Sequence, residues 1–150
     1  MDAIDAMRLA LLEAQEAAAE DEVPVGALLV YRDEVIAKDH NRIVQQKNPL
    51  AHAELLVMQA AVKMHPDPWL LDTTLFVTLE PCTMCTGALV LARVKRIVFG
   101  APDPKAGACG SVFDLARSSQ LNHRLEIESG LLQQECSTLL TNFFRKLRSV

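Results

Sequence analysis

Two short stretches constrain the fold of this chain more than any other feature of its sequence. They are His52-Ala53-Glu54 and Pro81-Cys82-Thr83-Met84-Cys85, and together they offer one imidazole, one carboxylate and two thiols. One histidine and two cysteines can bind a zinc ion, and three protein ligands leave the fourth tetrahedral position open, as in catalytic sites. A fold for this chain therefore has to bring the two stretches to one point.

Helical geometry predicts that both stretches lie where helices begin. Residues two apart on a helix point about 200° apart, so His52 and Glu54 converge only around the open start of a helix. Cys82 and Cys85 are three positions apart and share a helix face. Pro81 suits a place at or just before the first turn, where no backbone N–H is missed. Two positive dipole ends would then face the metal and favour thiolate over thiol.

Glu54 is interpreted as a proton carrier. Zinc with two thiolates carries no net charge, so it acidifies a water less than an all-histidine site does. A carboxylate beside the ion can take the proton of that water and hand it to a substrate. The simpler alternative is that Glu54 only favours the start of a helix, where acidic residues are common.

The periodicity of apolar residues predicts an α/β fold, with three α/β/α layers around a central five-stranded mixed sheet. We expect strands over residues 23–31, 34–39, 74–78, 96–100 and 125–128, and helices over residues 2–19, 52–64, 83–92 and 131–148. Residues 41–49 should form a polar loop, and residues 101–122 a Gly- and Pro-rich loop with one helical turn near 111–117. The passage 74–100 should be a parallel, right-handed crossover. We find no repeat or linker and predict one domain over residues 1–150.

Composition and charge narrow the functional classes. Half of the residues are apolar, as in ordinary globular proteins. The acidic start lacks the basic flank of a secretory signal, and no apolar stretch approaches the roughly 18 residues of a membrane helix. We therefore expect a cytoplasmic protein without membrane contact, in which a C-x-x-C pair binds metal more often than it forms a disulfide.

Charge is unevenly distributed along the chain. The net charge of −4 argues against non-specific nucleic-acid binding. Residues 1–22 carry seven acids and one base, and we expect the acidic face of the first helix to be solvated. The last six residues carry Arg145, Lys146 and Arg148 without an acid. This basic end is compatible with a localised RNA contact, although a basic last turn also suits the helix dipole.

Several single residues have a structural interpretation. Cys136 is expected in the core, His40 and His65 in solvated loops, and His123 as a residue that orders the loop before the last strand. Cys109 could complete a structural four-ligand zinc site, but Glu54 would then have no task.

Two further positions are ambiguous in the sequence. Gly26 indicates a bulge, the close approach of a ligand, or plain packing. Phe144 lies about 100° round the helix from Phe143 and is the better candidate to stack on a nucleotide base. Phe143 belongs to the predicted core stripe of the last helix, which consists of Leu132, Cys136, Leu139, Phe143 and Leu147.

Motifs along nearly the whole chain carry a resemblance to a known family. They are Glu22 to Ala27, Asn41-Arg42, Pro49 to Glu54, Val77 to Cys82, Val98 to Ala101, Asp103, Lys105, Gly107, Gly110-Ser111, Asn122 to Arg124 and Phe143 to Arg145. With the H-x-E and P-C-x-x-C pair, they make the chain resemble the tRNA-specific adenosine deaminases. That family belongs to the zinc-dependent cytidine/deoxycytidylate deaminase superfamily, whose signature is this pair.

The resemblance implies a cytidine deaminase-like fold and a role for each matching position. His52, Cys82 and Cys85 would bind one Zn²⁺ per subunit, and Glu54 would shuttle protons. Substrate contacts would come from the Asn41 side chain, from backbone groups of Val25 and Ala53, from the loop with Asp103 and Lys105, and from Phe144, Arg145 and Arg148. Members of the family are homodimers, and a helix face near residues 84–93 (Met84, Leu89, Leu91) could form such an interface.

The function that these expectations favour is hydrolytic deamination of adenosine to inosine at the wobble position of a tRNA anticodon stem-loop. Zinc-activated water and Glu54 would carry out the reaction. Two alternatives stay open at this point. One is deamination of free cytosine or guanine, and the other is a non-catalytic RNA-binding module stabilised by zinc.

Overall fold

Five strands form one mixed sheet in the computed structural model, which describes residues 1–149. The strands are β1 (Gly26–Tyr31), β2 (Glu34–His40), β3 (Thr73–Leu79), β4 (Arg96–Ala101) and β5 (Glu126–Ser129), and their order in the sheet is β2-β1-β3-β4-β5. β1 pairs antiparallel with both β2 and β3, whereas β3–β4 and β4–β5 are parallel pairs. The predicted mixed sheet and the parallel crossover after β3 are confirmed.

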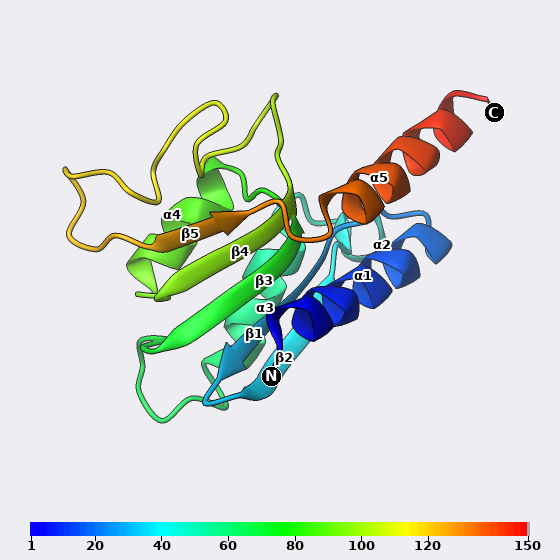
Figure 1. Cartoon of the computed structure of the whole chain (residues 1–150). Coiled ribbons are helices and arrows are strands. Elements are labelled where there is room, and N and C mark those ends of the chain that lie inside the picture. Colours follow the sequence, from blue (N-terminus) through cyan, green and yellow to red (C-terminus); the bar gives the residue numbers. More distant parts are fainter. Residues whose placement is uncertain (150) are drawn as a thin grey trace.

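Helices cover both faces of the sheet. They are α1 (Ala3–Ala19), α2 (Ile43–Gln46), α3 (Ala53–Ala61), α4 (Thr83–Leu91) and α5 (Gln133–Arg148). Figure 1 shows α1 and α5 on one side of the sheet and α3 and α4 on the other, with the far end of α5 projecting beyond the sheet. This confirms the three-layer α/β/α arrangement. None of the helices in residues 1–149 is long and apolar enough to cross a membrane.

Alternation along the central strands divides the core into two parts. Leu28, Phe76 and Val98 are neighbours across the sheet and pack with α1 and α5. Leu29, Leu75 and Ile97 form the next row and pack with α3 and α4. Central strands that are buried on both faces carry near-continuous apolar runs, which here are Ala27 to Val30 in β1, Leu75 to Val77 in β3 and Ile97 to Phe99 in β4.

Gly26 owes its place to packing. A Cβ at this position would collide with the backbone oxygen of Ala10 in α1, so only glycine lets the helix lie this close to the strand. The irregularity in the β1–β2 pairing falls elsewhere, between Leu29 and Val30. Of the three interpretations of Gly26, the plain packing reason is therefore the correct one.

The structure corrects several local expectations. The first strand begins at Gly26 and not at residue 23, and α2 forms within the expected polar loop 41–49. The helical turn expected near 111–117 is absent; these described residues form turns, with an isolated bridge between Cys109 and Asp114. Long-range contacts decide the conformation of such segments, and local periodicity does not encode them. The prediction of one domain over 1–150 stays a prediction, and its last residue lies outside the described range.

The C-terminal helix is less buried than its apolar stripe suggests. Cys136 is its buried residue and packs in the core as predicted, whereas Phe143 is half-buried and Leu147 is 56% exposed. The expectation that Phe143 belongs to the core is therefore wrong in degree, because the second half of α5 extends past the sheet (Figure 1).

Two loop histidines are held by backbone groups. The Nε2 atom of His123 lies 2.7 Å from the carbonyl oxygen of Val94, which confirms that His123 orders the loop before β5. The expectation of a solvated His65 is incomplete, because its Nε2 lies 2.9 Å from the carbonyl oxygen of Leu71 and its Nδ1 accepts from the N–H of Asp67. His65 therefore ties together the turn between α3 and β3.

Candidate metal centre and active site

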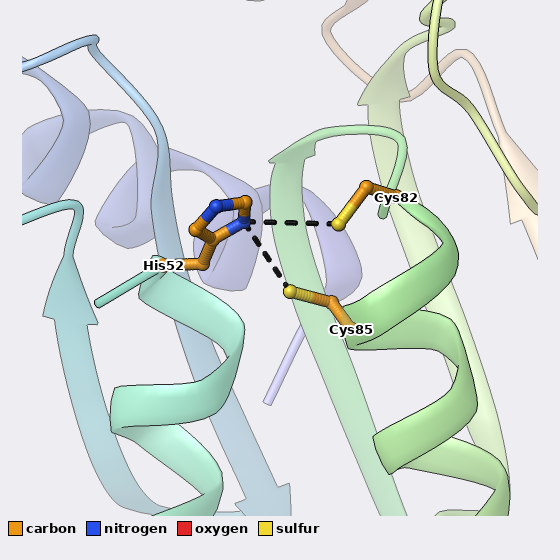
Figure 2. A group of neighbouring side chains, drawn as sticks. All are labelled: His52, Cys82 and Cys85. Atoms are coloured by element: carbon orange, nitrogen blue, oxygen red, sulfur yellow. Dashed lines mark hydrogen bonds between the residues drawn. The ribbon is translucent and has the colours of Figure 1, made fainter. Parts of the chain in front are cut away.

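The two chemistry-bearing stretches meet at the starts of two helices. His52 is the N-cap residue of α3, Cys82 is the N-cap residue of α4, and Cys85 lies in the first turn of α4. The Nδ1 atom of His52 is 3.8 Å from Sγ of Cys82 and 3.5 Å from Sγ of Cys85. Figure 2 shows the imidazole from one helix turned towards the two sulfurs of the other. The predicted placement at helix starts is confirmed.

These distances fit a tetrahedral metal site. With Zn–N near 2.0–2.1 Å and Zn–S near 2.3 Å, ligand atoms at tetrahedral angles lie about 3.6 Å apart. The three ligand atoms here all lie within 4.8 Å of one another and form a group that can hold a metal ion. Cys109 lies outside this group, with its Sγ 3.5 Å from Oγ1 of Thr86. The four-ligand structural site is therefore not formed.

The two thiols next to His52 affect each other's ionisation. A hydrogen bond from Cys85 lowers the pKa of Cys82 to about 4, and the same hydrogen bond, together with burial, raises the pKa of Cys85. A thiolate at one sulfur disfavours a second thiolate beside it. A cation bound by both sulfurs would favour the thiolate form of each.

Glu54 lies two residues beyond His52, in the first turn of α3, and is 4% exposed. Burial raises its pKa to about 7. A carboxyl with such a pKa can both accept and donate a proton near neutral pH. A cation held beside it would favour the carboxylate, which is the form that accepts a proton.

Asn41 follows β2 and is fixed from both sides. Its backbone N–H donates to the carbonyl oxygen of Val25 at 3.1 Å, and its Oδ1 accepts from the N–H of Ala53 at 2.8 Å. Because a backbone N–H can only donate, the side-chain oxygen is committed and the NH₂ group is left as a donor. The backbone groups of Val25 and Ala53 thus frame the site through Asn41.

These groups line a cavity of about 250 Å³ beside the cluster. Its walls combine apolar side chains with a few polar groups, as ligand sites do. The lining residues are Val23, Val25, Asn41, Ile43, His52, Glu54, Leu79, Glu80, Cys82, Asp103 and Ala106. Below, this space is called the inner cavity.

A second cavity of about 580 Å³ adjoins the first and shares Val23, Leu79 and Asp103 with it. We call it the outer groove. Its other lining residues are Pro102, Pro104, Lys105, Leu140, Thr141, Phe144 and Arg148. The structure therefore brings together four of the predicted RNA-contacting residues, whereas Arg145 is exposed on α5 and does not line the groove.

Two walls of the inner cavity have a support that sequence reasoning missed. Glu22 is 2% exposed and accepts from the backbone N–H groups of Val44 and Gln45 at 3.1 and 2.7 Å. It thereby holds α2, which supplies Ile43 to the cavity wall. Glu80 is equally buried, and its carboxylate accepts from the backbone N–H of Asp103, which lines the cavity on another side. The available signal was that each acid lies at the edge of an apolar run that forms a strand.

His40 lies next to Asn41 and is buried, contrary to the expected solvated loop. It is 1% exposed, with Nδ1 3.0 Å from a carboxylate oxygen of Glu13 and Nε2 2.9 Å from one of Glu20. Burial lowers the pKa of His40, but the hydrogen bonds to the two carboxylates outweigh it and the pKa is raised. The acids of α1 and its C-cap are therefore only partly solvated, since two of them hold this imidazolium.

The face of α4 that was expected at a dimer interface is also only partly available. Leu89 is fully buried in the core, whereas Leu91 is 79% exposed. Helical phase explains the difference, because two positions correspond to about 200° around the helix.

Comparison with known proteins agrees with the site. Residues 1–148 match the family of MafB19-like deaminases. The chain is 46% identical over 142 residues to the tRNA-specific adenosine deaminase of Bacillus subtilis (strain 168), covering 95% of this chain and 88% of that protein.

Two solved structures show how close the likeness is. One comes from a study of A-to-I editing by tRNA:A34 deaminases at the wobble position. It has a TM-score of 0.87 and 40% identity, over 91% of this chain and 99% of that one. The guanine deaminase of Nitrosomonas europaea is similar with a TM-score of 0.73 and 25% identity, over 93% and 83% of the two chains.

Proposed function

The chain belongs to the family of tRNA-specific adenosine deaminases, and on this premise we propose that it converts adenosine to inosine at the wobble position of a tRNA anticodon loop. The observation that carries the proposal is the group of His52, Cys82 and Cys85 with Glu54 beside it at the wall of a cavity. A groove with cationic and aromatic side chains adjoins that cavity.

The metal of the proposal is Zn²⁺, one ion per chain, held by His52, Cys82 and Cys85. A His/Cys/Cys donor set is typical of zinc deaminases and suits Zn²⁺ better than hard, oxygen-preferring cations. When bound, the ion supplies Lewis-acid activation of water for attack on the base.

Glu54 carries the protons of the proposed reaction. It accepts a proton from the attacking water, passes one to N1 of the adenine ring and delivers one to the departing amino group. Adenosine and water thereby give inosine and ammonia. The buried position of Glu54 beside the ligand group suits a residue that acts first as a base and then as an acid.

Asn41 and the apolar walls would hold the base. The target base has to leave its stack to reach a site of this kind. The NH₂ group of Asn41 is the free donor of a fixed side chain and would bind an acceptor on the purine edge. Val25, Ile43 and Leu79 line the cavity and offer apolar contacts to the faces of the ring.

The outer groove would hold the nucleotides next to the target. Phe144 is 41% exposed and can stack on a base, and Lys105 and Arg148 can bind phosphate groups. This explains how a chain with a net charge of −4 could bind RNA at one place only.

The proposal includes a homodimer, formed through the helical face on the α3–α4 side. Leu91 of α4 and Val62 next to α3 are exposed by 79% and 42%, and a mostly apolar pocket on this face is lined by residues of both helices. Contiguous apolar surface can mark an interface. Light scattering on a size-exclusion column would give the mass of a dimer if this is correct and of a 16.5 kDa monomer if it is not.

One experiment separates the proposed function from its alternatives. The protein is incubated with an anticodon stem-loop RNA that carries adenosine at the wobble position and, in parallel, with cytosine and guanine. We expect inosine in the RNA and no ammonia from the free bases. The matched control is the same RNA with the adenosine moved one position. Ammonia from a free base alone would favour the second function, and RNA binding without inosine would favour the non-catalytic module.

A further inference from the structure

Glu80 lies at the end of β3, directly before the metal-binding motif, and holds a single loop. Its carboxylate accepts from the backbone N–H of Asp103 at 3.0 Å, of Cys109 at 3.0 Å and of Ser111 at 3.1 Å. The hydroxyl of Ser111 donates a fourth hydrogen bond to it. With 2% of its surface exposed, Glu80 has exchanged water almost completely for donors of residues 103–111.

The loop is wound closely around this carboxylate. A Cβ at Gly107 would collide with the carboxyl group of Glu80 and would lie 2.6 Å from the carbonyl oxygen of Asp103. The N–H of Gly107 in turn donates to the Asp103 carbonyl at 2.9 Å. Residues 102–108 belong to no helix or strand, so their conformation depends on such contacts. Backbone donors that are withdrawn from water need partners, and the Glu80 carboxylate is the acceptor for three of them.

The same loop forms the boundary between the two cavities. Asp103 lines both of them, Ala106 lines the inner cavity and Lys105 lines the outer groove. The hydrogen bond to Glu80 is made by Asp103 itself, two residues before Lys105. The position of both side chains therefore depends on the Glu80 carboxylate.

We propose that Glu80 is a positioning residue for RNA binding, which fixes loop 102–111 so that Asp103 and Lys105 lie at the passage from the outer groove to the inner cavity. The inference rests on the proposed function and extends it. Glu80 acts through the loop, so its loss weakens the recognition of RNA more than the chemical step.

The test is a double-mutant cycle between Glu80→Gln and Lys105→Ala, with the anticodon stem-loop as substrate. The glutamine amide keeps the size of the side chain but turns an NH₂ group towards the N–H donors of the loop. Loss of a charged acceptor with several partners should raise KM about tenfold, with a smaller change in kcat. Lys105→Ala should raise KM in the wild-type background and have little effect in the Glu80→Gln background.

Three controls make the result unambiguous. Metal content by elemental analysis and thermal unfolding are measured on each variant, because Glu80 lies two residues from Cys82. Ser111→Ala removes only the hydroxyl donor, so it tests the same contact if Glu80→Gln fails to fold. It should raise KM by a smaller factor than Glu80→Gln does.

The outcomes are distinguishable. An unchanged KM in Glu80→Gln and Ser111→Ala, or effects of Glu80→Gln and Lys105→Ala that simply multiply, would overturn the role of Glu80 alone. Wild-type protein that forms no inosine would overturn the proposed function and the inference with it. A rise in KM that appears in both single variants and does not multiply in the double variant supports the inference.

Discussion

His52 and His40 both lie near the inner cavity among ionisable side chains, and the two groups differ in how their charges are compensated. Both ring nitrogens of His40 face carboxylates, at 3.0 Å from Glu13 and 2.9 Å from Glu20. The Nδ1 of His52 faces the sulfurs of Cys82 and Cys85, at 3.8 and 3.5 Å. In the first group a histidine pairs with carboxylates of opposite charge, whereas one imidazole and two thiols form a donor set that suits a zinc ion.

Burial and access to a cavity distinguish the structural cluster around His40 from the chemical cluster around His52. His40 is 1% exposed and joins α1 to the end of β2, so its hydrogen bonds stabilise the fold. His52 and its neighbours line a cavity, which gives a substrate access to them. Both groups combine histidine with acids or thiols at short distance. Proximity alone therefore does not identify a catalytic site.

The largest effect should come from Glu54→Gln, which tests whether the group around His52 performs the chemistry. The amide has the shape of the carboxyl but cannot accept a proton, so we expect deamination to fall by at least about 10³-fold. The metal should stay at one ion per chain, since Glu54 is not among the ligands. Inosine formation and elemental analysis check both statements. Near-wild-type turnover would refute the role of Glu54.

The next effect concerns the metal itself. Cys85→Ser replaces a buried thiolate ligand with a poor one, and we expect the metal content to fall far below one ion per chain and activity to fall with it. Cys109→Ala is the matched control, because Cys109 is also buried but lies outside the ligand group. Equal metal loss in both variants would show that the assignment of ligands is incorrect.

His40→Gln should affect stability rather than chemistry. The variant loses a buried charged partner of two carboxylates, and we expect the free energy of unfolding to fall by about 2 kcal/mol. Urea titration measures the change. His65→Gln is the control, since His65 is bonded to neutral backbone groups. A His40→Gln protein of unchanged stability would contradict the structural role of this cluster.

The same cluster should give a pH dependence of stability with a defined sign. Because the pKa of His40 is raised above 6.5 in the folded chain, its contribution is fully present below pH 6.5 and is lost as the pH rises through the folded pKa. The hydrogen bond to His40 lowers the pKa of Glu20 below 4.5, so that contribution is lost as the pH falls through the lowered value. The charged groups around the ring are Glu13, Glu16, Glu20, Asp39 and Arg42.

Unfolding titrations of wild type and His40→Gln across pH 5–9 test this dependence. We expect the stability difference to be constant from about pH 5 to 6.5 and to shrink at higher pH. A difference that grows with pH would mean that the folded state holds His40 as the neutral imidazole.

The smallest effect concerns two neighbouring rings of α5, one of which lines the outer groove while the other packs near α1. Phe144 lines the outer groove, whereas Phe143 is half-buried beside Ala18 and Asp21 near the end of α1. Stacking on one base contributes about 1–3 kcal/mol, so Phe144→Ala should raise KM for the stem-loop by about tenfold. Phe143→Ala should lower the midpoint of thermal unfolding and change KM less. The reverse pattern would exchange the two roles.

The fold was predictable from the sequence to the extent that its causes are local. Apolar periodicity indicated five strands and four of the five helices, with ends displaced by a few residues. The missed helix α2 is four residues long and depends on Glu22, which lies more than twenty residues away in the chain. Local patterns carry no record of such a partner.

Residue chemistry and helical spacing by themselves determined the ligand set of His52, Cys82 and Cys85, the helix starts that hold it and the carboxyl of Glu54. A ligand set is a property of residue types, and two short spacings suffice to orient it. Only the tertiary structure decided that His40 is buried between Glu13 and Glu20, that Gly26 lies against α1, and that Glu80 holds the loop with Asp103. Burial and partners at these positions come from segments distant in the chain. The hydrogen bonds and close contacts at these positions form only when the packed layers exclude water.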